Sequence, residues 1–165
     1  MDDISADVRL AQRGSTEAFS RLYSTVYKDM YHIALYSLRS SHDAADAVSE
    51  AVLDAFRTLK KLRDPEKFRS WIMSILSAKI KRVQSEYFYV SEEISDMPQT
   101  DGFDFESVEL RDALNRLDGE SRLLLSMAVL GGYSGKEIAS ICKIKPGTVR
   151  SKLSRIKEKL RLELL

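Results

Sequence analysis

A lone cysteine in a chain of 165 residues excludes an intramolecular disulfide and a cysteine-based metal cluster. Cys142 falls at an apolar position, and we expect it to be a small buried side chain. The sequence also lacks any run near the ~20 apolar residues that a membrane-spanning helix needs. Acidic residues precede the first apolar run at the N-terminus, which argues against a signal peptide. We therefore expect a soluble cytoplasmic protein without direct membrane contact.

Residue patterns that carry catalysis are also missing. The two histidines, His32 and His42, stand alone, without the spacing that a metal site or a catalytic triad requires. The sequence contains no glycine-rich phosphate loop. Asp46, Glu50 and Asp54 recur every four residues, but such a row more often forms a solvated or partner-facing edge than a pair of catalytic carboxylates. We predict no enzyme activity, no cofactor and no metal site.

Charge is unevenly distributed along the chain, although the formal net charge is only +1. Residues 1–82 carry fourteen Lys or Arg against eleven acids, and residues 111–165 carry twelve against six. Residues 83–110, in contrast, contain eight acids and no Lys or Arg. An acidic connector therefore separates two ends that each carry more basic than acidic residues. The small net charge of the whole chain does not reveal this distribution.

Apolar residues recur at three- and four-residue spacings through most of the chain, and no alternating strand pattern occurs. The spacing predicts helices throughout residues 1–82. One of them runs from about Asp43 to Leu62, and a later one ends near Val83. We therefore predict an all-α fold.

The organisation into domains follows from a stretch without periodicity. Residues 85–107 contain Pro98, Gly102 and several acids, and no helical spacing persists there. We interpret this stretch as an acidic flexible linker. The chain is thus expected to form two small helical domains, one at residues 1–84 and the other at residues 108–165.

The C-terminal part predicts two helices joined by a tight turn. Ser134 and Glu137 form an S-x-x-E capping box at the start of the first helix. Pro146 suits the first position of the second helix, where its missing amide donor would be unused. The second helix then carries an inward apolar stripe, made by Val149, Leu153, Ile156 and Leu160. This arrangement predicts a helix-turn-helix, whose second helix would lie in the major groove of DNA.

The polar side chains of that second helix fall into two groups. A helical wheel at about 100° per residue turns one group away from the apolar stripe, where it could read base edges: Arg150, Ser151, Ser154 and Arg155. A second group lies lower on the flanks, within reach of phosphates: Lys152, Lys157 and Lys159. Across residues 134–161, nine Lys or Arg stand against two acids. The combination favours DNA binding over the alternative, a solvated helix in an ordinary bundle.

Four motifs, taken in chain order, resemble one family. Residues 43–56 read D-A-A-D-A-V-S-E-A-V-L-D-A-F, similar to the family pattern D-A-E-D-L-V-Q-E-x-F-L-x-A-W, and residues 68–71 read F-R-S-W, similar to F-R-x-W. Residues 132–139 read G-Y-S-G-K-E-I-A and residues 144–155 read I-K-P-G-T-V-R-S-K-L-S-R, similar to E-G-x-S-x-x-E-I-A and I-P-x-G-T-V-K-S-R-L-x-R. The chain therefore resembles bacterial RNA polymerase sigma factors of the extracytoplasmic-function group, which keep only the second and fourth conserved sigma regions.

This resemblance implies a protein that binds core RNA polymerase and directs it to promoter DNA, with an anti-sigma factor as a further partner. It implies polymerase contacts on the first motif, at Asp46, Ser49, Glu50 and Leu53. It also implies that the helix-turn-helix reads the upstream (−35) element as duplex. The predicted DNA contacts are Thr148, Arg150, Ser151, Lys152, Ser154, Arg155, Lys157 and Lys159.

The segment from Arg57 to Arg82 suits a different form of DNA. It carries nine bases against two acids, together with Phe68 and Trp71. Lys and Arg side chains neutralise phosphates, and aromatic rings stack on unpaired nucleobases. The segment therefore fits capture of the melted downstream (−10) strand. In the family, a base is flipped into the loop before F-R-x-W. The predicted single-strand contacts are Lys60, Lys61, Arg63, Lys67, Arg69 and Trp71. For the two aromatic residues, we favour packing in the core over contact with DNA.

Five positions depart from the family pattern. Ala45 and Ser49 replace a Glu and a Gln, Ser77 and Ala78 stand where Arg and Asn are usual, and Lys143 replaces the customary turn glycine. A positive φ at Lys143 would strain the turn by about 1 kcal/mol. None of these changes removes the predicted architecture.

Two other functional classes remain open. A stand-alone helix-turn-helix regulator would bind duplex DNA without polymerase, and would normally show a dimerisation helix or a sensing domain, neither of which is evident. A helical adaptor would use the basic C-terminus to bind an acidic protein. Promoter-specific transcription with core RNA polymerase would separate the three classes.

Overall fold

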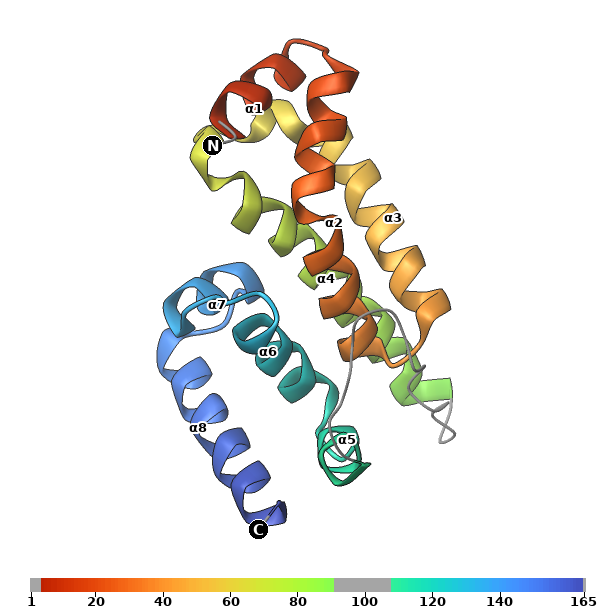
Figure 1. Cartoon of the computed structure of the whole chain (residues 1–165), viewed down its shortest axis with the longest axis vertical. Helices are drawn as coiled ribbons and strands as arrows, with labels where there is room; N and C mark the ends of the chain where they lie inside the picture. The colour runs from red at the N-terminus through yellow and green to blue at the C-terminus, as the bar shows by residue number, and fades with distance from the viewer. Residues whose placement is uncertain (1–3, 91–107, 165) are drawn as a thin grey trace.

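Helices account for all the regular structure of the computed structural model, which describes residues 4–90 and 108–164 (Figure 1). This confirms the predicted all-α fold. Most of the predicted linker, residues 91–107, lies outside the described residues. Within the two described ranges, no helix combines the length and the apolar character that crossing a membrane requires.

Six elements build the N-terminal half. In chain order they are α1 (Ile4–Gln12), α2 (Thr16–Leu38), α3 (Ser41–Thr58), the 3-10 turns η1 (Leu59–Lys61) and η2 (Pro65–Lys67), and α4 (Phe68–Val90). Serine side chains begin two of the helices, because Ser15 accepts a hydrogen bond from the amide of Ala18 and Ser40 accepts one from the amide of Asp43. Such caps satisfy amides that have no partner inside the helix.

Two helices end at positions other than those predicted. The helix expected over residues 43–62 stops at Thr58, and the short turn η1 follows it. The helix expected to end near Val83 continues to Val90, because residues 84–97 contain no proline or glycine that would break it. The predicted boundary after residue 84 therefore falls within α4.

Four helices form the C-terminal half. They are α5 (Val108–Asn115), α6 (Gly119–Val129), α7 (Gly135–Cys142) and α8 (Pro146–Glu163). The predicted capping box is present at the start of α7: the amide of Glu137 donates to Ser134 Oγ at 3.1 Å, and the amide of Ser134 donates to Glu137 Oε1 at 3.0 Å. Pro146 occupies the first turn of α8, as predicted.

Lys143 makes the turn between α7 and α8 with a left-handed backbone, at φ 56° and ψ 49°. Its amide donates to the carbonyl of Ala139 and so ends α7. A side chain other than glycine costs roughly 1–2 kcal/mol in this conformation. The turn therefore carries the strain expected from the missing glycine, and its sharpness places α8 beside α7.

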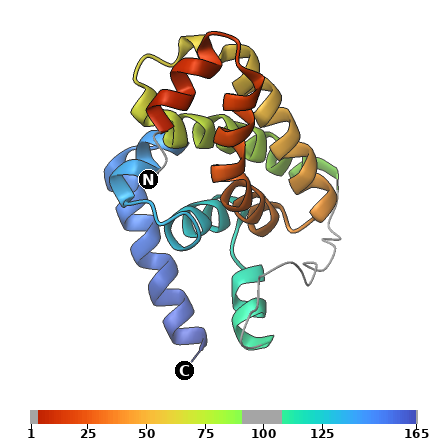
Figure 2. The same cartoon turned by 45° about the horizontal axis from the view of Figure 1, so that its top comes forward.

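Buried apolar side chains from the two halves form one continuous cluster. Its members include Leu22, Met30, Phe68, Ile72 and Leu76 from the first half, and Leu123, Leu124, Met127, Ile138 and Val149 from the second. The contact is direct, with α6 packed against α2 and α7 packed against α4 (Figures 1 and 2). Burying one large apolar side chain contributes ~1.5–3 kcal/mol, so this shared core holds the halves together.

We expect Leu124→Ala in α6 to lower the free energy of unfolding by about 2–5 kcal/mol, because Leu124 has no exposed surface and its removal leaves a cavity. Trp71 in α4, the one tryptophan, packs against the same cluster and reports the change by fluorescence during urea denaturation. Val129→Ala is the control, since Val129 lies on the same helix and is 69% exposed. If the urea midpoint reported by Trp71 fluorescence were the same in Leu124→Ala as in the wild type, the halves would unfold independently.

Candidate nucleic-acid and protein interfaces

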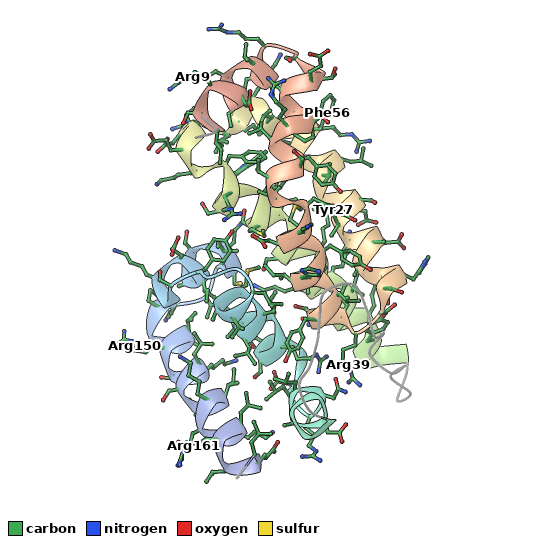
Figure 3. The ribbon with its side chains drawn as sticks, viewed as in Figure 1. Arg9, Tyr27, Arg39, Phe56, Arg150 and Arg161 are labelled. Atoms are coloured by element: carbon green, nitrogen blue, oxygen red, sulfur yellow. The ribbon has the colours of Figure 1, made fainter. Side chains whose placement is uncertain are left out.

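The apolar stripe of α8 seats this helix on the rest of the C-terminal half. Val149 and Ile156 are buried, at 0% and 4% exposure, and Leu153 and Leu160 are half-buried against the same apolar clusters. The predicted stripe is therefore confirmed, and the remaining faces of α8 point away from the core. Figure 3 shows Arg150 projecting outward from this helix.

The structure leaves nearly all predicted DNA contacts of α8 on the surface. Those exposed are Thr148, Arg150, Ser151, Ser154, Arg155, Lys157 and Lys159. Lys152 differs because it is half-buried and its Nζ lies 2.7 Å from Glu120 Oε2 of α6. Two arginines and two serines on one helix present hydrogen-bond donors and acceptors of the kind that read base edges.

Two grooves run along the flanks of α8 and divide these residues. The α7-side groove, of about 680 Å³, is lined by Gly135, Lys136, Pro146, Arg150, Leu153, Ser154 and Lys157. The α6-side groove, of about 440 Å³, is lined by Arg116, Leu117, Asp118, Ser121, Lys152, Arg155, Ile156 and Lys159. Each groove therefore contains one predicted reading arginine, beside one predicted anchoring lysine on the α7 side and two on the α6 side. The sequence missed Lys136 and Arg116, because their approach to α8 depends on how the helices pack.

One carboxylate interrupts the positive charge of the α6-side groove. Burial alone would raise the pKa of the Asp118 carboxyl, but hydrogen bonds from Ser121 outweigh it and hold the pKa below its usual range. The amide of Ser121 donates to Asp118 Oδ1 at 2.7 Å as the cap of α6. The α7-side groove, in contrast, is lined by three Lys or Arg residues and no acid, so it offers positive charge to a phosphate without a neighbouring carboxylate.

In the predicted acidic row on α3, Asp46 and Glu50 are exposed and Asp54 is half-buried, and the C-terminal part of the row is paired with α4. Asp54 Oδ2 lies 2.6 Å from Lys79 Nζ, and Glu50 pairs with Arg82. The hydrogen bond from Lys79 lowers the pKa of the Asp54 carboxyl. No sequence pattern links these residues, because the pairing arises only when α3 and α4 pack side by side. Among the described residues, the only basic side chain paired with Asp46, the first residue of the row, is His42, with 3.4 Å between Nε2 and Oδ2.

All four residues with an implied polymerase role lie on the surface of α3: Asp46, Ser49, Glu50 and Leu53. Leu53 is 53% exposed, and beside it Phe56 is 52% exposed. The Phe56 ring packs edge-on against Phe19, with 5.1 Å between centroids. The apolar spacing of the helix predicts that Phe56 points inward, and that prediction is wrong. Two exposed apolar side chains beside a carboxylate row are typical of a protein-binding surface.

The bases predicted to hold single-stranded DNA gather around η1 and η2. Lys60, Lys61, Arg63 and Lys67 are exposed, and none of them forms an ion pair with the residues that the structure describes. Gln12 of α1 fixes the segment, since its Nε2 donates to the carbonyls of Leu59 and Leu62 at 3.0 and 2.9 Å. The loop therefore presents free positive charge on a backbone that α1 holds in place.

The three residues that follow this loop have mixed roles. Phe68 is fully buried, which confirms core packing for this ring. Trp71 is half-buried, packs against the apolar cluster and lies 6.1 Å from the Phe68 ring. Arg69 is exposed, and its Nη2 lies 3.1 Å from Asp29 Oδ2 of α2. Only the outer part of Trp71 is therefore available to a nucleobase.

Three side chains at the start of α3 come close together. Potential ligand atoms of His42, Asp43 and Asp46 all lie within 4.8 Å of one another. All three belong to the first turns of a helix, where carboxylates are stabilised by the positive end of the helix dipole. Their arrangement is explained by that local effect, and we assign no metal to it.

Comparison with known proteins matches both halves to the same family. The family model described as sigma-70 region 2 matches residues 22–84, and the model described as sigma-70, region 4 matches residues 107–160. The chain is 24% identical over 151 residues to the ECF RNA polymerase sigma factor SigM of Mycobacterium tuberculosis, covering 89% of this chain and 77% of that protein. It is 27% identical over 173 aligned positions to the ECF RNA polymerase sigma-E factor of Escherichia coli K12, covering 92% and 88%.

A solved structure shows the same fold. The sigma factor RpoE of Bartonella quintana, crystallised in complex with the anti-sigma factor NepR, superposes with a TM-score of 0.74 at 19% sequence identity. The match covers 90% of this chain and 98% of that one. The likeness therefore includes both helical halves.

Region 2 and region 4 occur in this chain in order, separated by the acidic connector, and the relatives that span both halves are sigma factors of one group. The four motifs that first indicated this family lie within or beside the two matched segments. The chain therefore belongs to the extracytoplasmic-function group of RNA polymerase sigma factors, and it directs promoter recognition by core RNA polymerase.

Proposed function

We propose that three surfaces of this sigma factor divide the work of initiation. The exposed face of α3 docks on core RNA polymerase, the segment of η1 and η2 holds the melted −10 strand, and α8 reads the −35 duplex. The observation that carries the proposal is the separation of charge. The α3 face is acidic and apolar, whereas the Lys and Arg side chains around η1 and η2 are exposed and pair with no described carboxylate. Residues 1–84 would act as region 2 and residues 108–165 as region 4.

Docking through α3 is supported by charge and by exposed apolar surface. Among the described residues, no basic side chain other than His42 pairs with Asp46, so its charge is available to a basic partner. Leu53 and Phe56 supply apolar area next to it. Complementary charge steers association and fixes orientation, and a desolvated apolar centre supplies affinity. The partner surface is thus expected to be basic with an apolar centre, as on a helical element of the polymerase.

Capture of the single strand is supported by the exposed Lys and Arg side chains of the loop. Lys60, Lys61, Arg63 and Lys67 carry positive charge that no described carboxylate neutralises. Phosphates of an unpaired strand would replace their solvent counterions, and the exposed part of Trp71 would stack on a nucleobase. Because α1 and α4 hold the two ends of the loop, the bases are already positioned before DNA binds.

Several further features of the protein follow from this role. We infer that it works in the cytoplasm, where polymerase and DNA are present, and that it contributes no catalytic step of its own. We also infer an anti-sigma partner, because the Bartonella relative was crystallised with one. A stand-alone DNA-binding regulator or an adaptor would leave the exposed face of α3 without a purpose.

Reversing the charge of α3 should abolish polymerase binding. We expect Asp46→Lys with Glu50→Lys to eliminate co-purification with core RNA polymerase, because both positions would then repel a basic partner. Helical content, measured by circular dichroism, should remain unchanged. The matched control is Glu17→Lys with Asp112→Lys, which makes the same change in net charge at exposed positions on α2 and α5. Equal polymerase affinity of the two double variants would contradict docking through α3.

Neutralising the loop should weaken single-strand binding in a salt-dependent manner. With a −10 single-stranded oligonucleotide, we expect Lys60→Gln, Lys61→Gln and Arg63→Gln together to lower the slope of log affinity against log salt by about 2. Lys28→Gln, an exposed base on α2 outside the loop, should leave the slope nearly unchanged. Strand capture by this segment would be wrong if the triple variant bound the oligonucleotide with an unaltered slope.

Reading and anchoring should separate when residues of α8 are changed. Arg150→Ala should cost about 1–3 kcal/mol and relax the preference at particular base pairs of the −35 element. Lys159→Ala should weaken binding to all sequences alike and lower the salt slope by about one. Transcription from a library with a randomised upstream element measures both effects. Indistinguishable sequence profiles for the two variants would show that Arg150 anchors rather than reads.

A further inference from the structure

The first helix packs against the loop that carries the proposed single-strand contacts. α1 contacts both short turns of this loop, η1 and η2 (Figures 1 and 2). Gln12, the last residue of α1, donates from Nε2 to the carbonyls of Leu59 and Leu62, and these two hydrogen bonds fasten the loop to the helix. Side chains on the same flank of α1 as Gln12 are therefore carried next to the loop.

Two arginines at the end of α1 share the flank of Gln12. At about 100° per residue, Gln12 lies about 40° from the buried Val8, and Arg9 and Arg13 follow at about 100° and 140° in the same direction. Both arginines are exposed, and Figure 3 shows Arg9 at the outer edge of α1. Because they are four residues apart, their side chains are neighbours on the helix surface.

The acidic residue of α1 lies on the opposite flank and is already paired. Asp7 falls about 100° from Val8 in the other direction. Arg21 Nη2 of α2 lies 2.9 Å from Asp7 Oδ1, and the hydrogen bond from Arg21 lowers the pKa of the Asp7 carboxyl. Within the described ranges of the chain, no ion pair involves Arg9 or Arg13. Their charges are therefore not neutralised by any described carboxylate.

The arginines of α1 and the loop together form one basic surface. The Lys and Arg side chains of this α1–loop surface are all exposed: Arg9, Arg13, Lys60, Lys61, Arg63 and Lys67. Its two acids are Asp64 and Glu66, and Asp64 Oδ1 accepts a hydrogen bond from the amide of Glu66 at 3.1 Å. Six basic side chains against two acids leave a positive surface that continues from the loop onto α1.

The composition of the α1 flank favours a phosphate backbone over a protein partner. Apart from its two arginines, the flank presents only small or polar side chains, those of Ser5, Ala6 and Gln12. Leu10 is exposed but lies beyond this flank. A protein-binding surface normally has an apolar centre, whereas guanidinium groups bind phosphate oxygens through two parallel hydrogen bonds. Two neighbouring arginines therefore suit neighbouring phosphates.

From this arrangement we propose that α1 extends the strand-binding site: Arg9 and Arg13 bind phosphates of the unpaired DNA strand beyond the part that is held at η1 and η2. The inference rests on the proposed function, since it lengthens the path of the same strand. Gln12 is a positioning residue in this site. It holds the loop and α1 together, so both sets of basic side chains are in place before the strand binds.

Strand length separates the two parts of the site in an experiment. The full-length chain is titrated with two fluorescent single-stranded oligonucleotides, and binding is measured by anisotropy. The shorter one covers the −10 element, and the longer one continues about five nucleotides further at both ends. For the wild type, we expect the longer oligonucleotide to bind roughly fivefold more tightly, or better, because it reaches the arginines of α1.

Removing the charges of α1 should abolish this gain. We expect Arg9→Gln with Arg13→Gln to bind the two oligonucleotides with nearly equal affinity. For the longer oligonucleotide, the slope of log affinity against log salt should fall by about 1.4, since each phosphate contact of a single strand contributes about 0.7. Lys28→Gln with Lys145→Gln is the matched control, because it makes the same change in net charge at exposed positions on α2 and before α8. This control should keep the gain.

A charge-preserving variant distinguishes phosphate binding from a structural role. Arg9→Lys with Arg13→Lys should keep most of the gain, because lysine also neutralises phosphates. Glutamine and lysine both favour helices, so helical content, measured by circular dichroism, should be the same in all variants. If the lysine variant lost the gain as completely as the glutamine variant, the arginines would support the structure of α1 and the inference would be wrong.

Three further results would overturn the inference while capture at the loop stood. The wild type would bind the shorter oligonucleotide but gain nothing from the longer one, or the glutamine variant would keep the gain. An equal gain after the added nucleotides were annealed to a complementary strand would assign α1 to duplex DNA instead. If the wild type bound neither oligonucleotide, capture of the −10 strand would fall, and the inference with it. Binding of the shorter oligonucleotide therefore distinguishes the two kinds of failure.

Discussion

The packing of α6 and α7 against α2 and α4 is the interaction on which the remaining structure depends. The two halves share one apolar cluster, since Leu123, Leu124 and Met127 belong to the same cluster as Leu22 and Phe68, and a second, smaller cluster packs Tyr36 of α2 against side chains of the C-terminal half. A helical half of roughly 60–85 residues gains little margin from its own core, because small domains bury only about 60% of their unfolded surface. Sharing one cluster adds stability to both, and it also fixes how far apart their DNA-binding surfaces lie. The contacts that stabilise the protein therefore also limit the distance between its two proposed DNA-binding surfaces.

The acidic residues of α3 likewise have two competing sets of partners. The acids of α3 suit a basic partner, yet Asp54 and Glu50 already bind Lys79 and Arg82 of α4. Exposed ion pairs contribute only ~0–1 kcal/mol, so a polymerase surface with complementary charge can replace them at little cost. Lys79 and Arg82 of α4 would then be free to bind other groups. The loop bases need no such exchange, because no described acid pairs with them.

Local patterns were predicted well from sequence, and long-range contacts were not. The Ser134–Glu137 capping box, Pro146 at the start of α8 and the apolar stripe depend on residues three or four positions apart, and all three are present. The inward orientation assigned to Phe56 was wrong, because helical spacing cannot tell which side a neighbouring helix covers. The pairing of Glu50 with Arg82, and the contact of Gln84 with Gly119, join residues more than thirty positions apart. Only tertiary packing brings such residues together, so the spacing of residues in the sequence cannot predict these contacts.

The turn of the helix-turn-helix links local geometry to the contact between the two halves. At the end of α7, Lys143 adopts a positive φ, and the carbonyls of the final turn have no amide further along the helix to accept from. Lys81 of α4 donates to one of them, that of Cys142, and a cation at a helix C-terminus is also favoured by the helix dipole. The same sharp turn that sets α8 beside α7 therefore creates the acceptor that holds α7 on α4. A substitution at Lys143 that shifted the backbone away from positive φ would therefore alter both the orientation of α8 and the contact between the halves.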